Sequence, residues 1–122
     1  MSEIVVKPLF TIDDVKFSID CDPEDPSWLA NSFDNDEEII NDIKKQIRKG
    51  NDWAWCTIIV TARFKDFEGK DYLGGCSYGS EQNFIDADDY YQDMKKTAFD
   101  NLVEAANITL KELLSCFIVE SV

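Results

Sequence analysis

The stretch WAWCTIIVTARFKDFEGKDYLGGCSY, residues 53–78, decides the fold. Over residues 53–64 every even-numbered side chain is apolar. The odd-numbered side chains include both apolar and polar residues. This period of two predicts a strand with one face in the core. A turn at residues 66–69 leads into a second strand at residues 70–78. The two strands are therefore expected to form an antiparallel hairpin.

A helix is expected before this hairpin, over residues 36–49. Asn35 is a suitable N-cap, and Glu38 can complete a capping box. Gly50 follows as a C-terminal stop, and the four basic side chains of the last turns suit the helix dipole. One apolar face of this helix is made of Ile39, Ile40, Ile43 and Ile47.

A longer helix is expected after the hairpin, over residues 87–115 with Asp86 as its cap. Unbroken, it would measure about 43 Å at the α-helical rise, which exceeds the comfortable span of a globule of this size. We therefore expect either a break near residues 107–109 or a projecting end. The apolar tail at residues 116–122 is expected to pair as an extra strand or to pack against a second copy.

The N-terminal third is expected to supply two short strands, at residues 4–12 and 15–20, and then an acidic loop at 21–36. Three large apolar side chains are expected to hold this loop against the body: Trp28, Leu29 and Phe33. The whole chain, residues 1–122, is expected to be one α+β domain, because 122 residues are enough for one core. The expected order is β-β-α-β-β-α, an antiparallel sheet with both main helices packed on one face.

The charge is strongly negative and uneven. Twenty-five acidic and twelve basic side chains give a net charge of −13, with −10 in residues 1–43, +4 in residues 44–49 and −7 in residues 50–122. Such a chain repels nucleic acid and anionic membranes and attracts basic protein surfaces. Direct nucleic-acid binding is not expected, because it needs clustered Lys and Arg. No apolar run approaches the roughly 20 residues of a membrane span, so a cytoplasmic protein is expected.

The sequence offers no familiar catalytic apparatus. The chain has no histidine, which excludes Ser–His and Cys–His nucleophile pairs. The four cysteines contain no C-x-x-C pair, so a zinc site is not expected. We expect free, buried thiols instead. A bridge between Cys56 and Cys76 stays open for an exported protein. The chain is therefore expected not to be an enzyme and to need no cofactor.

Three acidic clusters, at residues 20–25, 34–38 and 86–89, were compared with calcium-binding EF-hand loops. None has glycine at the sixth position, and the twelfth positions are Asn31, Lys45 and Thr97 instead of Glu. No metal site is expected from these clusters. The pair Gly74-Gly75 lacks the spacing of a phosphate-binding loop and is expected to permit a bulge or close helix packing.

Aromatic side chains are dense around the hairpin and the start of the last helix. Core packing is one explanation for them, and the other is a partner surface in which aromatics anchor and acids steer. The candidate partner-binding residues are Asp34, Asp36, Glu37, Glu38, Asp71, Asp86, Asp88, Asp89, Trp53, Trp55 and Tyr90.

Residues 51–102 resemble a block found in small uncharacterised acidic proteins of phages and mobile elements. The motifs W-A-W, D-Y-L-G-G-C-S-Y and Y-Y-x-D-M carry this resemblance. It brings no known chemistry, but it implies a context in which small acidic proteins inhibit host defence or nucleic-acid-handling proteins, sometimes by imitating the charge of DNA.

The expected function is therefore an inhibitor that binds a basic, nucleic-acid-binding surface of a host protein in the host cytosol. One alternative is an accessory module that acts as a homodimer through the long helix and the apolar tail. A carboxylate- or cation-dependent enzyme ranks below both.

Overall fold

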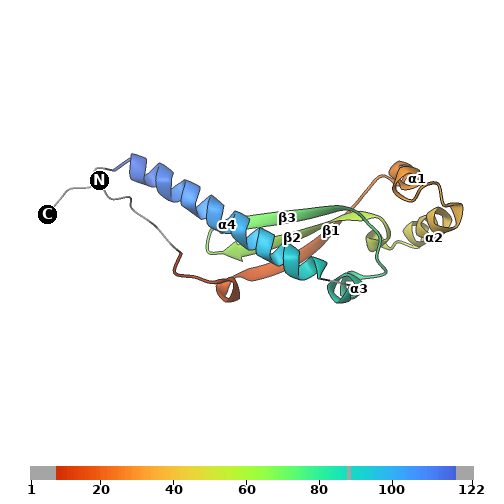
Figure 1. Cartoon of the computed structure of the whole chain (residues 1–122), viewed down its shortest axis with the longest axis horizontal. Helices are drawn as coiled ribbons and strands as arrows, with labels where there is room; N and C mark the ends of the chain where they lie inside the picture. Colours follow the sequence, from red (N-terminus) through yellow and green to blue (C-terminus); the bar gives the residue numbers. More distant parts are fainter. Residues whose placement is uncertain (1–7, 88, 118–122) are drawn as a thin grey trace.

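The structure is a computed structural model that describes residues 8–87 and 89–117. Its centre is a three-stranded antiparallel sheet in the order β1-β2-β3 (Figure 1). The strands are β1 (Lys16–Pro23), β2 (Cys56–Phe64) and β3 (Phe67–Cys76). The expected hairpin is confirmed as β2 and β3, and the expected strand at 15–20 is confirmed as β1.

Helices surround the sheet on one face and at one end. The helices are α1 (Leu29–Ser32), α2 (Glu37–Arg48), α3 (Glu81–Asp86) and α4 (Tyr90–Ser115). Short 3-10 helices are η1 (Ile12–Asp14), η2 (Pro26–Trp28) and η3 (Asp52–Ala54). The order of strands and main helices is β-α-β-β-α, so the α+β class and the antiparallel sheet are confirmed.

The strand expected at residues 4–12 is not found in its described part. Residues 8–11 lie outside any strand, and Ile12 begins η1. Thr11 favours this turn, because its side chain accepts from the amide of Asp13 and its own amide donates to the carboxylate of Asp14 at 2.8 Å. The rest of the expectation, at residues 4–7, lies outside the described residues.

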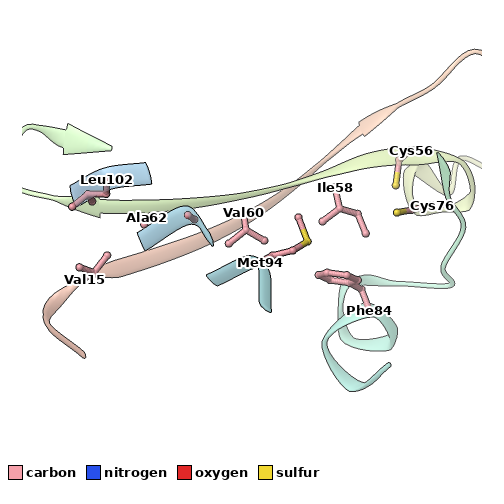
Figure 2. Close-up of a cluster of buried hydrophobic side chains, with 10 residues drawn as sticks. Val15, Cys56, Ile58, Val60, Ala62, Cys76, Phe84, Met94 and Leu102 are labelled. Carbon is pink, nitrogen blue, oxygen red and sulfur yellow. The ribbon is translucent and has the colours of Figure 1, made fainter. Parts of the chain in front are cut away.

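The main core lies between the sheet and α4. Side chains of β2 (Cys56, Ile58, Val60, Ala62) face Met94, Ala98 and Leu102 of α4, with Phe84 of α3 beside them (Figure 2). Helix α4 lies very close to β3 at Gly69, where a Cβ would lie 2.2 Å from the carbonyl oxygen of Ala98. Glycine is thus required for the helix backbone to rest directly on the strand.

A second, smaller core determines the position of α2. Leu29, Ile40, Ile43, Ala54 and Trp55 form this cluster beyond the end of the sheet, where α2 contacts α1 and η3. The expectation that both main helices pack on one face is therefore wrong for α2. The physical reason is that Trp55 gives this helix its own apolar surface beyond the end of the sheet.

Helix α4 is continuous from Tyr90 to Ser115, a length of about 39 Å. The expected break at residues 107–109 is absent, and the alternative of a projecting end is confirmed, because the last turns of α4 extend past the sheet (Figure 1). Apolar side chains are exposed along these turns and just after them: Ile108, Leu113, Leu114 and, beyond the helix, Phe117. Of the tail, residues 118–122 lie outside the described residues.

Candidate functional site

The excess of negative charge lies in two segments of the chain. Residues 17–43 contain nine acidic side chains and residues 71–94 contain six, and neither segment contains a lysine or an arginine. The remaining residues hold ten acids and all twelve bases, so they are close to neutral. The excess of negative charge therefore belongs entirely to these two segments.

Strand pairing brings both segments to one end of the sheet. Pro23 at the end of β1 pairs with Cys56 at the start of β2, and Cys56 pairs with Cys76 at the end of β3. Helices α1, α2 and α3 follow at this same end (Figure 1). We call it the acidic end, residues 20–55 and 73–93. The opposite end, residues 12–17, 61–71 and 96–117, is called the hairpin end.

The two ends carry different mixtures of charge. At the hairpin end acids alternate with bases, including Lys16, Arg63 and Lys65, and Arg63 pairs with Glu68 at 3.1 Å. At the acidic end the basic residues are gathered in one place, the last turns of α2 and the residue after them. These are Lys44, Lys45, Arg48 and Lys49.

A groove of about 320 Å³ runs along the last residues of β3 at the acidic end. It is lined by Phe33 after α1, by residues 73–78 and by Tyr90 at the start of α4. Asp34 follows Phe33 in the chain, and Asp89 precedes Tyr90. Both negative segments therefore contribute an aromatic residue to one groove, and each of these aromatics is next to an acid in the sequence.

The first group of candidate acids surrounds the turn between α1 and α2. Asp34, Asp36, Glu37 and Glu38 are all exposed. Asp36 is the N-cap of α2, and its carboxylate accepts from the amide of Ile39 at 3.3 Å. The cap is thus one residue later than expected, because Asn35 adopts a left-handed backbone with a φ of 59°.

The second group lies at the junction of α3 and α4. Asp86 and Asp89 are exposed there, and Asp88 lies outside the described residues. Asp71 does not join this group, because it pairs with Val60 in the middle of the sheet and is half-buried.

The three candidate aromatics divide between surface and core. Trp55 is only 2% exposed, and its indole donates to the carbonyl of Asp25 at 3.0 Å, so we correct its expected role as a partner contact. Trp53 is half-buried and stacks on Phe84 with ring centroids 6.2 Å apart. Tyr90 is 47% exposed and is the candidate aromatic that a partner could reach. Core packing therefore explains Trp55, and it explains the buried part of Trp53.

Sequence reasoning missed Glu24, which organises the acidic end. Its carboxylate accepts from the hydroxyl of Thr57 at 2.5 Å and from the amide of Gly75 at 3.0 Å, so it joins β2 and β3 beyond the end of β1. Gly75 has a φ of 64° within the bulge that was expected at the glycine pair. These partners are 33 and 51 residues away in sequence, so no local pattern could reveal the contact.

Three cysteines lie beneath this end, at the ends of the three strands. Burial raises the pKa of the Cys56 thiol to about 12, and the neighbouring thiol of Cys21 adds to the rise. Burial also raises the pKa of Cys21 and of Cys76. All four cysteines are free, and Cys56 and Cys76 are unbridged although they are paired across the strands. Protonated, buried thiols act as small apolar side chains here.

The described ranges 8–87 and 89–117 contain no group of three His, Cys, Asp or Glu arranged to hold a metal ion. Within the same ranges, no helix combines the length and the apolar character that a membrane span requires. The chain matches no known protein family, no curated protein and no solved structure.

Proposed function

We propose that this chain is a non-enzymatic acidic inhibitor whose acidic end covers a basic, nucleic-acid-binding surface of a host protein, as a DNA mimic does. The observation that carries the proposal is the meeting of two base-free acidic segments around one groove. In the phage context that the block at residues 51–102 implies, the partner is a defence or nucleic-acid-handling protein in the host cytosol.

The charge arrangement supports long-range attraction with a preferred orientation. The carboxylates of the two base-free segments add their fields, and the basic side chains of the acidic end are confined to the end of α2, whereas the mixed charges of the hairpin end largely cancel. Screening limits this attraction to about 10 Å at moderate salt. A basic surface would therefore approach the acidic end first, and its rate of association would fall as salt rises.

The groove supports short-range contact after this approach. Phe33 and Tyr90 offer aromatic surface beside the acids, and such a combination favours arginine, whose guanidinium pairs with carboxylates and stacks on rings. Arginine is also the side chain that nucleic-acid-binding surfaces use most for bidentate contacts. An arginine-rich surface therefore fits both the charge and the shape of this site.

The test is affinity capture from the host, followed by competition with DNA. The immobilised protein is expected to retain a nucleic-acid-binding protein, and excess duplex DNA is expected to release it. A neutralised variant of the acidic end, Asp34→Asn with Asp36→Asn, Glu37→Gln and Glu38→Gln, is expected to bind that protein about tenfold more weakly or worse.

The matched control removes the same charge from the other end of the molecule. Asp66→Asn with Asp100→Asn, Glu104→Gln and Glu112→Gln neutralises four exposed acids of the hairpin end. Its affinity is expected to stay within about twofold of the unchanged protein. Equal losses in the two variants, or a captured protein that DNA does not displace, would contradict the proposal.

A further inference from the structure

Among the residues that the structure describes, no strand pairs with the outer edge of β1. Among the described residues the sheet has the order β1-β2-β3, so β1 is hydrogen-bonded along one side only, over the eight residues Lys16–Pro23. Such an edge presents a row of backbone donors and acceptors that can pair with another strand.

Helix α4 leaves the β1 side of the core partly uncovered. It packs mainly on β3 and β2, and the core-facing side chains of β1, Phe17, Ile19 and Cys21, are each only half-buried. A depression of about 330 Å³ lies beside Phe17, and its lining includes Val15, residues of η1 and Lys95 of α4. A further strand at this edge would therefore bury apolar surface as well as pair the backbone.

We propose that β1 pairs antiparallel with β1 of a second copy, around a two-fold axis at Ile19. This register forms one continuous six-stranded sheet. Each Lys16 then lies opposite Asp22 of the other copy, and each Phe17 lies opposite Cys21. Residues that lie opposite each other in such a pair point to the same face of the sheet. The ion pairs therefore form on the face turned away from α4, and the apolar pairs form on the face that packs against α4.

The distribution of charge favours this occupant. The two-fold axis reverses the direction of the second copy, so its acidic end lies beside the hairpin end of the first and the two acidic ends point apart. Parallel pairing would instead place Asp20 and Asp22 against themselves, which is unfavourable for directly opposed like charges. An extended basic segment of another protein could meet these acids, but it would leave Lys16 facing a like charge.

The dimer goes beyond the proposed inhibitor and does not depend on it. If both hold, the two acidic ends are presented at opposite poles of the dimer, so that it can bind two basic surfaces at once. Its test measures self-association alone and needs no partner, so failure of one proposal leaves the other to be judged on its own measurement.

The test is sedimentation equilibrium of the full chain and of charge-reversed variants over a range of micromolar concentrations. The unchanged protein is expected to dimerise. Lys16→Asp and Asp22→Lys each turn two expected ion pairs into like-charge pairs, so each is expected to weaken the dimer by about tenfold or more. The double variant, Lys16→Asp with Asp22→Lys, restores opposite charges and is expected to recover the dimer.

Two controls locate the interface. Lys70→Asp makes the same charge change on β3, on the same face of the sheet and away from β1, and is expected to leave the dimer intact. Leu113→Asp tests the exposed apolar end of α4 and is likewise expected to change nothing at the β1 edge. A monomer at every concentration, a dimer lost only with Leu113→Asp, or no recovery in the double variant would each overturn the proposal.

Discussion

The acidic end and the hairpin end of this protein are built by different means. At the hairpin end a helix lies in direct backbone contact with a strand at Gly69, and the side chain of Asn101 donates to the carbonyl of Lys70 at 2.8 Å. At the acidic end α1, α2 and η3 gather around a small separate core, and the acids outnumber the few basic side chains, which are confined to the end of α2. Tight packing and concentrated charge are thus separated along the molecule.

Among substitutions at the hairpin end, Gly69→Ala is expected to lower the free energy of unfolding most. The new methyl group would meet the backbone of Ala98 and of Leu102, and backbone atoms cannot move aside as a side chain can. We expect a loss of about 3 kcal/mol or more in the free energy of unfolding, measured with urea. Gly74→Ala in the same strand is the control, because its nearest neighbour is a side chain, that of Glu24 at 3.2 Å. Its expected cost is about 1 kcal/mol, and equal losses would refute the account of the Gly69 contact.

Leu29→Ala tests whether the small core at the acidic end unfolds separately from the main core. Leu29 is fully buried in that cluster, so its truncation is expected to cost about 2 to 4 kcal/mol. Hydrogen exchange should show lost protection in α1 and α2, with the amides of β2 and α4 still protected. Simultaneous loss of protection in all four elements would mean that the two cores form one cooperative unit.

The buried thiols make the acidic end sensitive to alkali. The pKa of Cys56 is raised by burial, so the folded state holds its proton more tightly than the unfolded state. Stability is therefore fully present below about pH 9 and falls as the pH rises toward about 12, by on the order of 2 kcal/mol at about pH 11. Chemical denaturation across this range measures the slope. Cys56→Ala should flatten it, and an unchanged slope would assign the alkaline loss to other groups.

Two substitutions at the N-cap of α2 distinguish the effect of charge from the effect on stability at the acidic end. Asp36→Ala removes the acceptor of the Ile39 amide and is expected to cost about 1 kcal/mol. Asp36→Asn removes the charge but keeps an acceptor, so its stability is expected to change by only about a few tenths of a kcal/mol. Thermal unfolding of the two variants is the measurement. If they are equally unstable, neutralised variants of this end would test stability as well as binding.

The smallest effect is expected from the ion pair of the hairpin end. Glu68→Gln removes the negative charge from the 3.1 Å pair with Arg63, but both side chains are about half exposed. Water and salt screen such pairs, so the expected loss is about 0.5 kcal/mol or less by urea unfolding. A loss several times larger would show that charge pairing, and not packing, stabilises the hairpin end.

Local patterns predicted the parts of the fold that local physics determines. The alternation at residues 53–64 predicted β2, and the isoleucine stripe predicted α2. What failed depended on distant contacts. The position of α2 is set by Trp55, which the strand pattern assigned only to the mixed face, and the short capped turn at Thr11 prevailed over an extended segment.

The candidate site could be predicted only in its composition. The acids near α1 and α3 were identified from sequence, but only the antiparallel pairing of Cys56 with both Pro23 and Cys76 brings their segments to one end of the sheet. The division of the aromatics between Trp55 in the core and Tyr90 at the surface also depends on packing. Neither environment can be read from the neighbouring residues in sequence, because burial depends on distant contacts such as the hydrogen bond from Trp55 to Asp25.

The central claim is that the concentrated charge of the acidic end is a binding surface. An amide-resolved NMR titration with a polyarginine peptide tests it most directly, because the peptide reports where a basic surface is preferred on the intact protein. We expect the largest shifts at residues lining the groove, from Phe33 and residues 73–78 to Tyr90, with few at the hairpin end. Shifts spread evenly over both ends, or concentrated around residues 61–71, would contradict it.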